Sequence, residues 1–121
     1  MKISEQILLD KEFPFQIYDK EGNITKVETI RVKELLAMVI IGLRKRSMVN
    51  GKLDEGKLAQ LTASKMIVDA PFESEDDKKW VDMDESSKVE FLTKLSTTYV
   101  SQLSNMIREL QPQITEEEKN L

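Results

Sequence analysis

The chain has 121 residues, of which 40% are hydrophobic and 33% are charged, and this composition is typical of a single globular domain. It contains no cysteine and no histidine, which excludes disulfide frameworks, zinc–thiolate sites, thiol nucleophiles and histidine-based acid–base catalysis. The net charge of −4 divides into +2 for residues 1–60 (11 basic, 9 acidic) and −6 for residues 61–121 (7 basic, 13 acidic), which argues against nonspecific nucleic-acid binding.

The first ten residues combine a short apolar cluster with acidic side chains, and this pattern does not fit a signal peptide. No apolar run approaches the roughly 20 residues that a membrane-spanning helix needs. We therefore expect a cytoplasmic protein that does not insert into membranes.

Residues 13–32 are predicted to form a β-hairpin. Its first strand places large apolar side chains at every second position, which is the period of a half-buried strand: Phe13, Phe15 and Ile17. Pro14 predicts that this strand lies at a sheet edge, because its missing N–H costs no ladder bond there. The return strand alternates less regularly, which predicts a bulge or a short second strand.

The turn of this hairpin is predicted over residues 19–23. The Asp19 carboxylate can accept hydrogen bonds from turn amides, and Gly22 can adopt a positive φ without steric cost.

The second predicted element is a helix over residues 32–49. Its middle, residues 35–43, is apolar on all sides except at Gly42, which indicates either the buried centre of the domain or a protein interface. We favour the buried centre, with a neighbouring helix packed closely at Gly42. Periodicity alone does not exclude a strand for this run.

A basic cluster, Arg44, Lys45 and Arg46, follows the apolar run, with Lys52 beyond it. Basic side chains stabilise the carbonyl end of a helix, and we favour this interpretation. The alternatives are an anion or nucleic-acid contact and an acidic partner surface.

The pair Asn50-Gly51 is predicted to end this helix in a left-handed conformation, and a hairpin turn is the less favoured alternative. Asp54 is then predicted to cap a third helix over residues 55–69, which stops before Pro71.

The acidic connection over residues 73–85 contains the single tryptophan of the chain, Trp80. We favour a side chain that closes the core, while a tryptophan in an acidic loop also suits a partner contact. Asp82 and Asp84 have calcium-loop spacing, but the glycine and the bidentate glutamate of that loop are missing.

The last predicted helix covers residues 85–111 and carries the clearest periodicity. Its start is marked twice, by Asp84 and by a capping box at Ser87 and Glu90, and Pro112 ends it. Its apolar stripe has an average step of 3.6 residues and follows the sequence Leu92, Leu95, Tyr99, Leu103, Met106 and Leu110.

The opposite face of this helix has no charge, although one-third of the chain is charged. It consists of Thr97, Thr98, Ser101, Gln102, Ser104 and Asn105. Either this face is an ordinary solvated one, or it is half-buried against the protein or a partner.

These elements predict an α+β, mainly helical fold, in which an N-terminal β-hairpin packs on about three α-helices and the last is a long amphipathic helix. Residues 1–111 are predicted to form one compact domain, and residues 112–121 an acidic tail.

The most favoured function is a non-catalytic protein–protein interaction module, such as a small assembly factor, chaperone, adaptor or inhibitor. The layout resembles that of small phage-encoded accessory proteins, but no specific residues carry this resemblance. The partner is expected to be another protein or a second copy, with no cofactor, metal or small-molecule substrate. The alternatives are a nucleic-acid accessory protein and a carboxylate metal site in the acidic loop. The candidate partner-binding residues are Trp80, Arg44, Lys45, Arg46, Ser101, Gln102 and Asn105.

Overall fold

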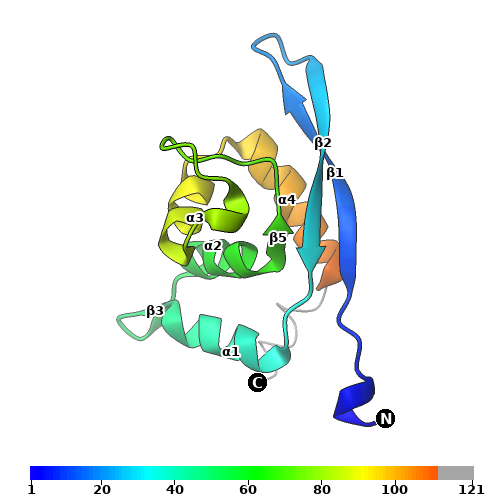
Figure 1. Ribbon diagram of the computed structural model, residues 1–121. Coiled ribbons are helices and arrows are strands. Elements are labelled where there is room, and N and C mark those ends of the chain that lie inside the picture. Colours follow the sequence, from blue (N-terminus) through cyan, green and yellow to red (C-terminus); the bar gives the residue numbers. More distant parts are fainter. Residues whose placement is uncertain (112–121) are drawn as a thin grey trace.

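The computed structural model describes residues 1–111, and the predicted acidic tail, residues 112–121, lies outside the described residues (Figure 1). The strands are β1 (Asp10–Tyr18), β2 (Ile24–Lys33), β3 (Met48–Val49), β4 (Lys52–Leu53) and β5 (Ile67–Asp69). The helices are α1 (Ala37–Arg46), α2 (Glu55–Met66), α3 (Glu85–Thr93) and α4 (Thr97–Leu110), with short 3-10 turns η1 (Ile3–Glu5) and η2 (Trp80–Asp82). The predicted α+β class, with its N-terminal hairpin and long C-terminal helix, is confirmed.

The main sheet has the order β1-β2-β5, and both pairs of neighbours are antiparallel. β1 and β2 form the predicted hairpin, and the predicted bulge appears as a register shift between Ile17 and Tyr18. β5 pairs with β2 only at Arg31 and Val32. The sheet is therefore three strands wide at the base of the hairpin and two strands wide towards its tip.

The hairpin turn has the predicted chemistry. Asp19 Oδ1 accepts hydrogen bonds from the backbone N–H groups of Glu21 and Asn23, each at 2.9 Å. Gly22 has a φ of 84°, a conformation that side chains with a Cβ rarely adopt. These contacts fix the turn without any packing from the rest of the domain.

The outer edge of β1 is closed by side chains of α4. Gln16 donates its backbone N–H to Gln102 Oε1 and accepts from Gln102 Nε2, both at 2.9 Å, so Gln102 takes the place of a neighbouring strand. Two residues on, the backbone N–H of Tyr18 donates to the Tyr99 hydroxyl at 3.2 Å. Pro14 has the same strand parity as Gln16, so its missing N–H falls on this edge, as its sequence position predicted.

The core lies between one face of the sheet and the helices. Trp80 is at its centre with an exposed fraction of 0%, and the Phe72 ring contacts both the Trp80 and Phe91 rings with centroid separations of 5.6 and 4.8 Å. The apolar stripe predicted for the last helix packs into this core. A smaller cluster of Leu43, Leu58 and Leu61 holds α1 on α2.

The second helix differs from the prediction in both length and burial. β2 continues to Lys33, so the helix begins at Ala37 and ends at Arg46, and the apolar run is helical rather than a strand. The prediction of a buried centre was wrong, because only Leu43 of α1 is buried. Within residues 1–111 no helix packs at Gly42, where an added Cβ would meet no described atom within 4 Å. Within residues 1–111 the core is filled by the sheet, α2, α3 and α4, and α1 packs on α2 through its Leu43 side.

Asn50-Gly51 forms the less favoured alternative, a hairpin turn. The two residues have φ values of 52° and 76° and connect β3 to β4. Positive φ at both central positions is the geometry of a two-residue hairpin, which Asn-Gly suits well.

The third helix begins as predicted, since the Asp54 carboxylate accepts the backbone N–H of Lys57 at 3.0 Å. It ends at Met66 instead of continuing to residue 69, and Ile67–Asp69 forms β5. The segment begins with β-branched residues, which favour strands, and its backbone pairs with the open edge of β2. This pairing stabilises a strand here in spite of the helical sequence pattern.

The single helix predicted over residues 85–111 is two helices. α3 ends at Thr93, and Ser96 has extended dihedrals at the start of α4. The apolar period continues through the break because Leu95 and Tyr99 pack on the same core, so the sequence pattern conceals it. Of the two predicted caps, Asp84 is the one used, and its carboxylate accepts the Ser87 N–H at 2.8 Å.

Candidate partner-binding surface

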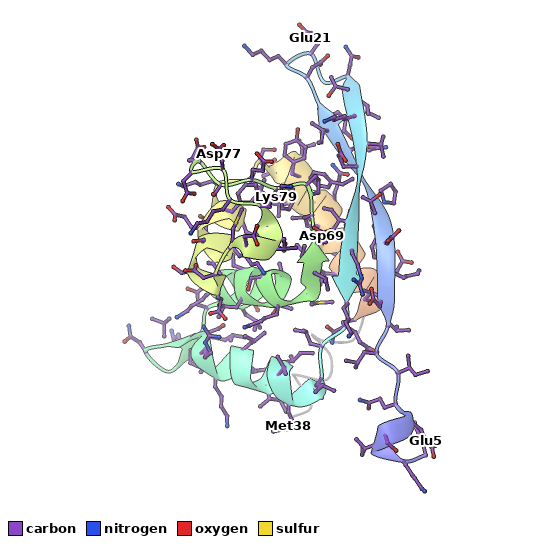
Figure 2. The ribbon with its side chains drawn as sticks, in the orientation of Figure 1. Glu5, Glu21, Met38, Asp69, Asp77 and Lys79 are labelled. Carbon is purple, nitrogen blue, oxygen red and sulfur yellow. The ribbon has the colours of Figure 1, made fainter. Side chains whose placement is uncertain are left out.

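The outward side of α1 has no packing partner among the described residues. Met38, Gly42 and Lys45 follow one another at helical spacing on this side, opposite the buried Leu43. Met38 has an exposed fraction of 74%, and Figure 2 shows it on the side of α1 turned away from the other helices. An apolar helix face of this kind is unusual on a solvated surface.

Further apolar side chains are exposed before the helix and directly after it. We define the α1 surface as the large exposed apolar residues of this stretch together with Gly42 and Lys45: Leu36, Met38, Val39, Gly42, Lys45, Met48 and Val49. Single exposed apolar residues are ordinary, but several large ones along ten to fifteen residues of chain are typical of interaction sites.

The charge at this surface is basic. Lys45 lies on the outward side of α1, and Lys52 is exposed in β4. Within residues 1–111 the structure shows no ion pair of either lysine. The α1 surface therefore combines exposed apolar side chains with positive charge.

The third predicted member of the basic cluster has an internal role. Arg46 hydrogen bonds to both carboxylate oxygens of Glu85, the first residue of α3, and Lys65 Nζ lies 2.9 Å from Glu85 Oε2. The Arg46 hydrogen bond, supported by Lys65, lowers the pKa of Glu85 from 4.5 to about 2. This carboxylate ties the C-terminal ends of α1 and α2 to the start of α3.

The lowered Glu85 pKa predicts a specific pH dependence of stability. The folded-state pKa lies below the unfolded value, so the stabilisation is complete above about pH 4.5 and is lost as the pH falls through that range towards 2. Because the partner side chains are about half exposed, we expect Glu85→Gln to cost only about 1 kcal/mol at pH 6 and almost nothing near pH 2. Urea unfolding at a series of pH values measures this difference.

Glu90→Gln is the matched control, since Glu90 lies on the same helix and pairs with Lys94 at 3.1 Å in an exposed i,i+4 arrangement. Its cost should be a few tenths of a kcal/mol. A Glu85→Gln cost that stays constant from pH 6 to pH 2 would show that the carboxylate charge is not the source of the stabilisation.

The remaining predicted contact residues are dispersed. The core interpretation of Trp80 is confirmed, because its Nε1 donates to the Ile67 carbonyl at 2.9 Å and its indole is not accessible in this conformation. Gln102 is half-buried and bonded to β1, whereas Ser101 and Asn105 are exposed on α4. Arg44 is half-buried and Lys45 exposed on α1.

The acidic loop uses Asp84 as a helix cap, and the hydrogen bond from the Ser87 backbone holds the pKa of this carboxyl below its usual range. In the part of the chain that the structure describes, no three acidic side chains converge in a way that could hold a metal ion.

A groove of about 600 Å³ separates α2 from α4. Its lining is mainly apolar, with Glu55 and Arg108 as the charged members. Leu53 lines the groove and pairs across β3–β4 with Met48 of the α1 surface, so the small hairpin joins the two features. The sequence offered no indication of this groove, because helices distant in the chain form it.

Comparisons of the chain with protein-family models, with curated proteins and with solved structures found no match. Within residues 1–111, no helix combines the length and apolar character that crossing a bilayer requires.

Proposed function

We propose that the protein is a non-catalytic protein–protein interaction module, such as a small assembly factor, chaperone, adaptor or inhibitor, that binds its partner through the α1 surface. The observation that carries this proposal is the exposure of Met38 and its apolar neighbours on a helix whose packing against the described residues, through Leu43, lies on its other side. Burial of large apolar side chains is the main favourable term in most protein association.

The chemistry of the α1 surface also indicates the kind of partner. An apolar strip beside Lys45 and Lys52 suits an amphipathic segment with acidic residues, which would lay its apolar side on α1 and its carboxylates near the lysines. A cytoplasmic location is part of the proposal and fits a chain without cysteine. Arg46 is bonded to Glu85, so we do not carry the nucleic-acid alternative forward.

Met38→Glu is expected to weaken partner binding at least about tenfold, because it places a carboxylate at the centre of an apolar contact that has a basic rim. The side chain is exposed, so folding stability should change by about 0.5 kcal/mol or less. The measurement is a pull-down that compares the proteins retained by the tagged wild-type and variant chains. A protein that the wild type retains and the variant does not is then titrated against both chains by calorimetry.

Val81→Glu is the matched control, since Val81 is also an exposed apolar residue but lies in η2, away from α1. A partner that is lost with Met38→Glu and retained with Val81→Glu supports the proposal. Equal retention of every partner by the two variants would contradict it.

A further inference from the structure

The tip-side half of β2 presents backbone hydrogen-bonding groups that point away from β1. Val27 lies opposite Gln16, whose N–H and C=O are both bonded to Gln102 and not to β2. Opposite residues in an antiparallel pair either exchange both hydrogen bonds or exchange none. The N–H and C=O of Val27 must therefore point outward, and those of Thr29, opposite Pro14, must do the same.

This edge is uncovered among the described residues. β5 pairs with β2 only at Arg31 and Val32, and no other described strand joins the part of β2 before them. Figure 1 shows the tip of the hairpin extending beyond the helices, and Val27 has an exposed fraction of 59%. An unpaired strand edge is a template for another strand.

We propose that a second copy of this chain pairs antiparallel with this edge, with the two-fold axis at Val27. The two Val27 residues would exchange both backbone hydrogen bonds. Lys26 would then lie opposite Glu28 of the second copy, and Glu28 opposite its Lys26, in non-hydrogen-bonded pairs whose side chains approach most closely. Within one chain these two side chains already lie on the same face, with Lys26 Nζ 3.3 Å from Glu28 Oε1.

Charge selects this register over its neighbours. Centring the pair on Lys26 would oppose two lysines, and centring it on Glu28 would oppose two glutamates. Centring it on Thr29 would require the outward backbone groups of Arg31 to pair with the second copy, but Arg31 already pairs with Asp69 of β5. Only the Val27 register gives two reciprocal opposite-charge pairs and leaves β5 in place.

Charge reversal tests the register directly, with sedimentation equilibrium as the measurement. Lys26→Glu makes positions 26 and 28 both acidic, and Glu28→Lys makes both basic, so each variant alone would oppose like charges. Each should therefore dimerise at least about tenfold more weakly than the wild type. An equimolar mixture of the two should form a heterodimer, because each acidic position then faces a basic one. The control is the same pair of changes at the tip of the turn, Lys20→Glu and Glu21→Lys, which should leave the dimer unchanged.

Val27→Pro supplies a second, uncharged test. Proline removes the backbone N–H of residue 27, which points away from β1 and is not used within the chain's own hairpin. The circular dichroism spectrum should therefore be retained while the dimer is lost. A wild-type chain that is monomeric at all accessible concentrations overturns the proposal. A dimer that resists both charge reversals also overturns it. The edge is distinct from the α1 surface, so a dimer retained in Met38→Glu separates this proposal from the proposed function.

Discussion

Replacing Trp80 with alanine is expected to lower the unfolding free energy by about 3–5 kcal/mol. The side chain is fully buried, contacts the Phe72 and Phe91 rings, and donates its indole N–H to the Ile67 carbonyl at 2.9 Å. Alanine would leave a cavity at the centre of the main core and an acceptor without its donor. Domains of this size typically have a total stability of about 5–15 kcal/mol, so such a loss would remove a large share of it. Urea denaturation followed by circular dichroism measures it.

Trp80→Phe separates the two contributions. It retains an aromatic ring but removes the N–H, so the Ile67 carbonyl loses its partner and the cost should be smaller than for alanine. The neighbouring Val81 is exposed, and Val81→Ala should change stability by about 0.5 kcal/mol or less. A small effect of Trp80→Ala would show that the core does not depend on this ring.

Replacing Leu43 with alanine is expected to cost about 2–5 kcal/mol and to release α1 preferentially. Leu43 is the buried residue of α1, and its contacts with Leu58 and Leu61 hold the helix on α2. Because this contact is the buried packing of α1 within residues 1–111, losing it affects the helix more than the distant sheet. Hydrogen exchange should therefore accelerate throughout Ala37–Arg46 before it accelerates in β1 and β2.

Met38→Ala is the matched control for this helix, because Met38 lies on the opposite, exposed side of α1. It should leave both the unfolding free energy and the exchange rates of α1 almost unchanged. Uniform acceleration of exchange across the whole domain in Leu43→Ala would contradict the assignment of Leu43 as a local anchor.

The elements that the sequence predicted well are those set by local chemistry. The Asp19 acceptor, the positive φ of Gly22 and the Asp54 cap each depend on residues within a few positions of one another. Pro14 likewise carries its own constraint, since a missing N–H is tolerated only at an edge. Such features do not require knowledge of what packs on them.

The predictions that were wrong depended on contacts between distant segments. Whether residues 35–43 are buried depends on how much of the core other elements fill, and the break before Ser96 is hidden because both helices place their apolar residues on one core. The same reason explains the candidate site. The apolar run was visible in the sequence, but its exposure is a property of the folded domain.

The bond between Gln102 and the Gln16 backbone also sets a limit on stoichiometry. In a sheet joined through two copies of β2, the outermost strands would be two copies of β1. On the exposed edge of each β1, the backbone N–H and C=O of Gln16 are already hydrogen-bonded to Gln102 of α4, and Pro14 has no N–H to donate. The two-fold contact also uses the Val27 edge of both copies, so no copy of that edge remains free. Association through this edge therefore ends at a pair and does not propagate into a filament.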